Sequence, residues 1–462
     1  MDKNPPETQG KQNSMSRPLR VAVIGAGPAG IYASDLLMKS DTDVLIDLYE
    51  RMPAPFGLIR YGVAPDHPRI KGIVTSLHKV LDKPELRLLG NIDIGNEVTV
   101  DELREYYDAI IFSTGATGDR NLDIPGADLE GSFGAGEFVG FYDGNPDFER
   151  SWDLSAESVA VVGVGNVGLD VARILAKTAN ELHTTEIPDN VYQTLKTNQA
   201  THIHIFGRRG PAQAKFTPLE LKELDHSPSI NVVVDPEDID YDEASIAARR
   251  ASKSQDLVCQ TLEQYAMRDP KGAPHKLTIH FLESPVEILG EDGNVVGLRT
   301  ERMELDGTGH VQGTGKFTEW PVQAVYRAVG YRSEAITAVP FDHGTAVIPN
   351  DGGHVVDPAG EVVPGVYVTG WIKRGPVGLI GNTKSDAKET TDMLIADALA
   401  GRLTPRTATG DITEYLEAQG IPYTTWDGWH KLDAHERSLG SAEGRERKKV
   451  VEWDEMVAHS RS

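Results

Sequence analysis

The chain has 462 residues, of which 39% are hydrophobic and 25% charged, as is typical of a soluble α/β protein with two or three domains. Its formal net charge of −24 opposes nucleic-acid binding through a global field, and no apolar run reaches the roughly 20 residues that cross a bilayer. The single cysteine, Cys259, excludes an intramolecular disulfide, a redox cysteine pair and any cysteine-ligated cluster or zinc site. Redox chemistry in this chain must therefore use an organic cofactor.

The first 18 residues are polar, with neither the apolar core of a secretory signal nor the arginine-rich pattern of a transit peptide. We expect residues 1–18 to form a disordered extension and the protein to be cytoplasmic. Met15 is a second candidate for the translation start, because the strand pattern begins only at Leu19.

A glycine fingerprint follows the first expected strand. Strands over 19–24 and 44–49, with a helix over 31–38 between them, form a βαβ unit. The GxGxxG spacing between strand and helix permits a tight turn, close approach of a pyrophosphate and close helix packing. Glu50 ends the second strand, where a carboxylate accepts hydrogen bonds from a ribose diol. The unit therefore predicts an FAD site, whose fingerprint residues are Gly25, Ala26, Gly27, Pro28, Ala29 and Gly30.

Residues 51–71 are rich in Pro and Gly without a clear period, and predict a long loop. A helix is expected next over 74–81. Strands are expected over 86–89, 92–94 and 107–114.

A second βαβ unit repeats the pattern, with strands over 159–162 and 202–206, a helix over 169–176, and an insertion over 180–199. Its GxGxxG runs from Gly163 to Gly168, and no acidic residue ends its second strand. Arg208 and Arg209 stand there instead, and guanidiniums match a dianionic 2′-phosphate by charge and fork geometry. The unit predicts NADP rather than NAD. Gly168 stands where NADP enzymes of this kind usually carry alanine, so a mixed preference for NADPH and NADH stays open.

The remaining chain completes the pattern of two domains. A meander of strands is expected over 277–282, 285–289 and 295–302, followed by strands over 324–329 and 366–369 and a helix over 384–400. The polar tail after residue 402 carries Trp426, Trp429 and Trp453, which we expect to pack at the surface, with contact to an acceptor protein as the alternative.

We predict an α/β fold with two Rossmann-like domains. The NADP-binding domain, residues 119–327, is inserted into an FAD-binding domain made of residues 19–118 and 328–462.

Several segments of the chain resemble the ferredoxin–NADP reductases of the adrenodoxin-reductase type, including their bacterial members. The resemblance extends from Val21 to about Ala396. The most distinctive segments are PFGLIR at 55–60, GVAPDHP at 62–68, GNVGLDVAR at 165–173, GRRGP at 207–211, FTPLEL at 216–221 and GWIKRGPVGLIG at 370–381.

The resemblance implies a flavoenzyme in which NADPH gives a hydride to FAD, and FAD passes single electrons to a small acidic iron–sulfur protein of the ferredoxin type. It also implies which residues contact the cofactors. Positions matching the FAD contacts of that family are Glu50, Leu58, Ile94, Trp371, Gly378, Leu379 and Ile380. Positions matching its NADP contacts are Arg120, Val164, Gly165, Asn166, Val167, Arg208, Arg209, Glu220 and Gly378.

Three ionisable residues, His67, Asp170 and Glu220, are the catalytic candidates. Release of single electrons from a reduced flavin requires loss of a proton, which a histidine of near-neutral pKa coupled to a carboxylate carries well. We predict that His67 and Glu220 form this pair; the alternative is that His67 only orders the Pro-rich loop. The sequence contains no HxxxH, HExxH or acidic cluster with metal spacing, so we expect no metal.

Two other classes of function remain. A flavin monooxygenase, or an NADPH oxidase-type flavoprotein, would use oxygen as acceptor, but we find no dedicated element for an organic substrate. A non-catalytic dinucleotide-binding protein is the other alternative. The presence of both fingerprints together with His67 and Glu220 argues against it.

Overall fold

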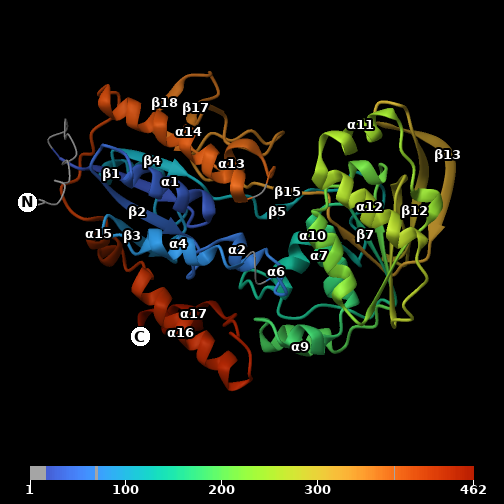
Figure 1. The fold of residues 1–462 in the computed structure, drawn as a ribbon. Helices are drawn as coiled ribbons and strands as arrows, with labels where there is room; N and C mark the ends of the chain where they lie inside the picture. The colour runs from blue at the N-terminus through green and yellow to red at the C-terminus, as the bar shows by residue number, and fades with distance from the viewer. Residues whose placement is uncertain (1–16, 68–70, 379) are drawn as a thin grey trace, which may run out of the picture.

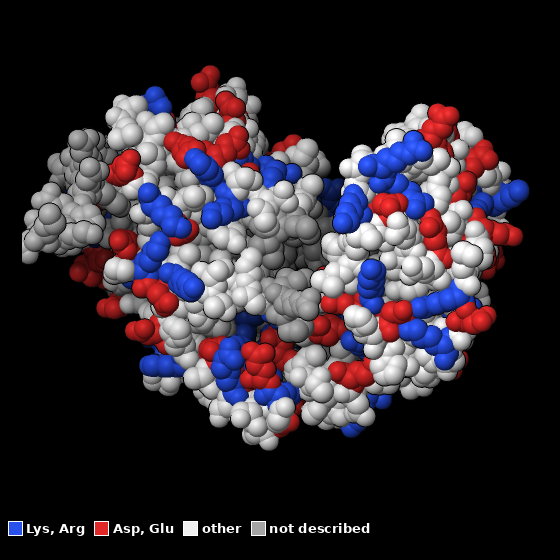
Figure 2. Space-filling model, in the orientation of Figure 1, with Lys and Arg blue, Asp and Glu red and all other residues white. Residues whose placement is uncertain are grey.

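The computed structural model describes residues 17–67, 71–378 and 380–462, and these residues form two lobes, each built on a parallel sheet (Figure 1). Figure 2 shows the same lobes as a surface with a notch between them. None of the described helices is long and apolar enough to span a membrane.

The first lobe contains a seven-stranded sheet with the order β16-β17-β18-β4-β1-β2-β3, parallel from β18 to β3. These strands are β1 (Leu19–Ile24), β2 (Val44–Glu50), β3 (Leu86–Gly90), β4 (Ala109–Phe112), β16 (Asn350–Asp351), β17 (His354–Val356) and β18 (Val362–Val368). Tyr367 of β18 pairs with Ile111 of β4, so a late segment of the chain lies inside a sheet of early ones.

Helices cover both faces of this first sheet. The alternating residues Val21 and Val23 of β1 face one hydrophobic cluster, and Ala22 and Ile24 face another. Helices α1 and α14 pack together in the first cluster. The helices of this lobe are α1 (Pro28–Met38), α2 (Leu58–Tyr61), α4 (Val74–Leu81), α5 (Val100–Tyr106), α13 (Trp371–Arg374), α14 (Ile380–Leu399), α15 (Ile412–Gln419), α16 (Trp426–Ala442) and α17 (Trp453–Arg461).

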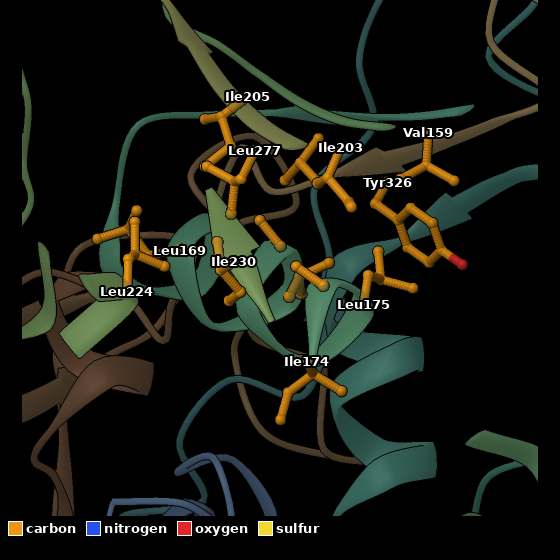
Figure 3. Close-up of a cluster of buried hydrophobic side chains, with 14 of the residues drawn as sticks. Val159, Leu169, Ile174, Leu175, Ile203, Ile205, Leu224, Ile230, Leu277 and Tyr326 are labelled. Atoms are coloured by element: carbon orange, nitrogen blue, oxygen red, sulfur yellow. The ribbon is translucent and has the colours of Figure 1, made fainter. Parts of the chain in front are cut away.

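The second lobe contains a six-stranded parallel sheet with the order β6-β14-β7-β8-β10-β9. Helices α7, α10 and α12 cover one face. Figure 3 shows part of the hydrophobic cluster on this face, with side chains of α7 beside those of the strands. An antiparallel sheet, β11-β12-β13, covers the other face. The strands are β6 (Ser132–Gly134), β7 (Ser158–Val162), β8 (His202–Phe206), β9 (Ile230–Val234), β10 (His275–His280), β11 (Glu283–Glu291), β12 (Asn294–Leu305), β13 (Val311–Trp320) and β14 (Ala324–Arg327).

The second lobe also carries the helices α6 (Ala135–Tyr142), α7 (Asn166–Ala176), α8 (Ala179–His183), α9 (Asp189–Leu195), α10 (Pro218–Glu223), α11 (Glu243–Ala251) and α12 (Lys253–Met267), and the 3₁₀ helices η1 (Pro211–Gln213), η2 (Leu224–His226) and η3 (Pro236–Asp238). The chain passes between the lobes twice, through β5 (Gly118–Asp119) and β15 (Tyr331–Arg332), which pair with each other. We keep domain boundaries near residues 118 and 328 as a proposal, which this pairing and the separate sheets support.

The structure differs from the predicted elements at several places. Residues 92–94 form only a bridge between Ile94 and Val98, because Asn91, with φ of 62°, turns the chain at the end of β3. The predicted loop 51–71 contains α2, and the insertion 180–199 contains α8 and α9. Of the predicted disordered extension, residues 1–16 lie outside the described residues. Arg17 is ion-paired with Asp108 at 2.6 Å.

The tail after residue 402 is a folded part of the first lobe rather than a polar surface segment. Trp429 is 2% exposed and belongs to the core cluster that contains β1. Glu436 of α16 is fully buried and ion-paired with Arg60. The segment after α16 also contacts both lobes, because Lys449 Nζ donates to the carbonyls of Arg60 at 2.6 Å and Asp143 at 3.0 Å.

Candidate active site

The first fingerprint connects β1 to α1, and its three glycines meet different surroundings. Gly25 has φ of 108°, and a Cβ there would lie 2.7 Å from the carbonyl oxygen of Ser113. A Cβ on Gly30 would collide with the carbonyl oxygen of Gly25, whereas one on Gly27 would meet nothing within 4 Å. Packing therefore requires the outer glycines. The middle one leaves open space at the N-terminus of α1, where a pyrophosphate is stabilised by free N–H groups.

Glu50, at the end of β2, is held against this fingerprint by the backbone. Its Oε2 accepts a hydrogen bond from the N–H of Ala26 at 2.9 Å, and its Oε1 accepts one from Met52 at 3.0 Å. Burial raises the pKa of the Glu50 carboxyl, and these two N–H donors oppose the shift. Each carboxylate oxygen has a further lone pair, so Glu50 can still accept from a ribose hydroxyl.

The second fingerprint repeats this construction between β7 and α7. Gly163 has φ of 133°, and a Cβ there would collide with the carbonyl oxygen of Ala328. A Cβ on Gly168 would collide with the carbonyl oxygen of Gly163, and one on Gly165 would meet nothing within 4 Å. Packing of α7 on β7 thus accounts for the glycine at 168, which therefore need not reflect a preference for NAD.

Arg208 and Arg209 follow β8, beside this fingerprint in the sheet order. In residues 17–67, 71–378 and 380–462, neither guanidinium has a hydrogen-bond or ion-pair partner. Arg120 lies at the lobe crossing, where its Nε donates to the carbonyl of Tyr331 at 3.2 Å. Asn166 Oδ1 accepts from the N–H of Thr217 at 2.9 Å, and thereby joins the fingerprint to the start of α10. Val164 and Val167 pack partly buried against the core of this lobe.

The C-terminal motif that begins at Gly370 packs on the first fingerprint. Gly370 has φ of 78°, and a Cβ there would lie 2.8 Å from Cβ of Ala29. Trp371 begins α13 and stacks on Tyr331, with ring centroids 6.1 Å apart. Gly378 has φ of 88°. Leu379 lies outside the described residues, and Ile380 begins α14.

Leu58 and Ile94 are two further apolar residues expected at the FAD site. Leu58 begins α2 directly after Gly57 and is half-buried. Ile94 is buried in the cluster on the second face of the first sheet. Their assignment to the FAD site stays a prediction.

His67 lies between the lobes, where it meets the predicted carboxylates. Its Nε2 is 2.7 Å from Glu220 Oε2 and 2.9 Å from Asp170 Oδ1, and its Nδ1 is 2.7 Å from Glu223 Oε2. Burial disfavours the imidazolium, but hydrogen bonds to Asp170 and Glu220 outweigh it and raise the pKa of His67 to about 9. This pKa lies above the near-neutral value expected from the sequence, and it favours the protonated imidazole at neutral pH.

Sequence reasoning missed three of the residues around His67. Glu223 contacts Nδ1, Arg173 Nη2 lies 2.7 Å from Nε2, and Asp66 forms an ion pair with Arg173 at 2.8 Å. The signals were present, because Asp66 and Arg173 stand in the distinctive segments 62–68 and 165–173, and Glu223 lies three residues after Glu220 on a helix.

The same cluster contains a geometry that a cation could use. His67, Glu220 and Glu223 each offer one ligand atom, and these atoms lie within 4.8 Å of one another. The guanidinium of Arg173 beside His67 would repel a cation, so we assign no metal here. The expected lack of a metal stays a prediction.

Known proteins match this chain over almost its whole length. Residues 19–204 match the family described as pyridine nucleotide-disulphide oxidoreductase. The chain is 40% identical over 459 residues to NADPH-ferredoxin reductase FprA of Mycobacterium tuberculosis, covering 96% of this chain and 99% of that protein. It is 37% identical over 455 residues to the mitochondrial NADPH:adrenodoxin oxidoreductase of Bos taurus, covering 95% and 91%. The structure of Mycobacterium tuberculosis FprA in complex with NADPH matches with a TM-score of 0.89 at 39% identity, covering 96% and 100%.

Proposed function

Because the chain belongs to the family of NADPH-ferredoxin and NADPH:adrenodoxin reductases, we propose that it oxidises NADPH and reduces a ferredoxin-type iron–sulfur protein, with FAD as resident cofactor. The observation that carries this proposal is the near-complete match to FprA in complex with NADPH. The single cysteine agrees with it, because electrons cannot stop at a dithiol within the chain and must leave to an external acceptor.

The residues of the first lobe fit FAD. The open space at Gly27 and the N-terminus of α1 accommodate a pyrophosphate, and Glu50 offers its carboxylate to a ribose. Leu58, Ile94, Trp371 and Gly378 are the further positions that we assign to this cofactor. When bound, FAD supplies hydride acceptance and single-electron transfer.

The residues of the second lobe fit NADP. Gly165 leaves the matching open space before α7, and the uncompensated charges of Arg208 and Arg209 suit a 2′-phosphate. The further positions that we assign to the nucleotide are Arg120, Val164, Asn166, Val167, Glu220 and Gly378. We expect NADPH to be strongly preferred over NADH.

His67 and the neighbouring carboxylates are assigned to proton handling. At neutral pH His67 holds a proton on Nε2, within hydrogen-bond distance of Glu220 and Asp170. These carboxylates are the nearest acceptors when the proton leaves. The raised pKa means that this proton is retained at neutral pH and lost as the pH rises through about 9. Glu220 is also the candidate for contact with the nucleotide.

We propose that the acceptor is small and acidic. The net charge of −24 requires a local basic surface for such a partner. Figure 2 shows Lys and Arg side chains on both lobes on either side of the notch. A cytoplasmic location stays a prediction.

Anaerobic stopped-flow mixing of the FAD-loaded protein with NADPH or NADH tests the proposal. We expect rapid bleaching of the flavin by NADPH, slower bleaching by NADH, and subsequent reduction of cytochrome c through adrenodoxin-type or bacterial ferredoxins. Failure of every ferredoxin together with rapid oxygen consumption would favour the oxygen-using alternative. A purified protein that binds NADPH but retains no flavin would favour the non-catalytic one.

A further inference from the structure

We propose that Arg173 is a positioning residue for the proton-holding pair: it anchors the segment that carries His67 to α7, and it stabilises the imidazole once Nε2 has lost its proton. The inference rests on the proposed function for its kinetic consequences. Its structural part, which concerns the proton on His67, can be measured without turnover.

The anchoring role follows from a buried bidentate ion pair between the lobes. Arg173 Nε and Nη2 donate to the two oxygens of Asp66 at 2.9 and 2.8 Å, and the Arg173 side chain is 1% exposed. Lys177, one turn further along, donates to the same carboxylate at 2.8 Å. Burial opposes the charge on Asp66, but Arg173 and Lys177 outweigh it and hold the pKa of Asp66 well below its usual range. A bidentate fork fixes both distance and orientation, so the residue before His67 is held in one place on the second lobe.

The second role follows from the contacts of one nitrogen atom. His67 Nε2 is 2.7 Å from Glu220 Oε2, and also 2.7 Å from Arg173 Nη2, which is always a donor. While Nε2 carries a proton it donates to a carboxylate, and Arg173 faces another donor. After the proton has left, the lone pair of Nε2 accepts a hydrogen bond from Arg173. Arg173 therefore favours the neutral imidazole, whereas the carboxylates favour the protonated one.

Charged groups from three segments set this balance. The segment of His67 supplies Asp66, helix α7 and its C-terminal end supply Asp170, Arg173 and Lys177, and helix α10 supplies Glu220 and Glu223. Tyr142 of α6 lies within electrostatic reach of Asp170. Arg173 is the cation of this set in contact with His67, and it opposes the raised pKa of that residue.

The variant Arg173→Gln removes the charge, and Lys177→Gln is the matched control. Lys177 donates to the same oxygen of Asp66 as Arg173 Nε, but in the part of the chain that the structure describes it forms no hydrogen bond or ion pair with His67. We expect the pKa of His67 to rise from about 9 by roughly 1–3 units in Arg173→Gln. In Lys177→Gln the shift should stay below about half a unit.

Titration of ¹³C-labelled histidine by NMR in the FAD-loaded protein measures this shift, with His67→Gln used to assign the resonance. An unchanged titration in Arg173→Gln, or an equal shift in the Lys177→Gln control, would overturn the proposal. If Arg173→Gln fails to fold, Arg173→Lys tests the proposal instead. Lysine keeps the positive charge but cannot form the bidentate contact with Asp66. It should leave the titration within about half a unit, and a rise of more than one unit would contradict the role assigned to the charge.

The pH dependence of ferredoxin-coupled turnover separates this inference from the proposed function. If His67 handles protons in turnover, the alkaline limb of kcat should move upward together with the NMR titration in Arg173→Gln. A shift in the titration without a shift in kcat would leave the role of Arg173 standing and would reject proton handling by His67. Equal titrations in the two variants would reject the role of Arg173, whatever the pH profiles of kcat show.

Discussion

The two fingerprints have the same backbone construction, but different side chains stand where the ribose of a dinucleotide would bind. At the first, Glu50 already accepts two backbone hydrogen bonds, one of them from Ala26 within the fingerprint. At the second, Arg208 and Arg209 have no hydrogen-bond or ion-pair partner in the part of the chain that the structure describes. A group fixed before binding loses little conformational freedom when the ligand arrives, whereas two long side chains must be ordered by it. The first site is thus preorganised, as suits the resident cofactor that we propose there, whereas the arginines of the second site become ordered only when a nucleotide binds.

The largest effect is expected from substitution of the fingerprint glycines, whose pattern occurs at both sites. In Gly30→Ala the new Cβ would collide with the carbonyl oxygen of Gly25, so the backbone must move at a cost of about 1–3 kcal/mol or more. In Gly27→Ala the Cβ enters open space, so the apoprotein should keep its Tm while FAD binding weakens. Thermal unfolding with and without FAD measures both. Equal losses of Tm in the two apoproteins would contradict the different roles assigned to these glycines.

A smaller effect is expected from the unpaired arginines. The double variant Arg208→Gln and Arg209→Gln removes both charges at the nucleotide site, and loss of one hydrogen bond to a charged group at each arginine costs about 1.5 kcal/mol, or about 3 kcal/mol together. We expect KM for NADPH to rise roughly 100-fold while KM for NADH changes little. Steady-state kinetics with both nucleotides measures this. A parallel rise for NADH would mean that the arginines do not contact the 2′-phosphate.

The smallest effect is expected at Glu50, because Glu50→Gln preserves size and one carbonyl oxygen. The amide NH₂ then faces either Ala26 or Met52, which leaves one backbone N–H without an acceptor at a cost of about 1–3 kcal/mol. We expect the dissociation constant of FAD to rise roughly 10-fold, with the preference for NADPH over NADH unchanged. Flavin fluorescence during dialysis measures the first quantity. A change in nucleotide preference would break the assignment of one nucleotide to each site.

Local patterns made the βαβ units and both fingerprints predictable, because each depends on neighbouring residues whose hydrophobic period and spacing can be read directly. The tail after residue 402 was not predictable in the same way. Trp429, Leu432 and Glu436 share one buried face of α16, but a glutamate at the buried position hides the apolar stripe. The burial of Glu436 depends on its ion pairs with Arg60 and Arg447.

The candidate site shows the same limit. Pairing of His67 with Glu220 could be predicted from the motifs, and the structure places the two side chains in contact. The pKa of His67 could not be predicted, since it depends on distances to charged groups that lie about 100 and 150 residues away along the chain. Asp170 contributes from α7 and Glu220 from α10, and only tertiary structure brings them to the same nitrogen.

The position of β18 inside the first sheet has a consequence for the order in which a ribosome-bound chain can fold. All six strands of the second sheet lie between residues 132 and 327, so that sheet is complete while the C-terminal fifth of the chain is still being synthesised. Strand β4 keeps an unpaired edge until residues 362–368 emerge, and Lys449 reaches Arg60 and Asp143 later still. The lobe that starts first is therefore finished last, and until then the unpaired edge of β4 stays open to wrong pairing.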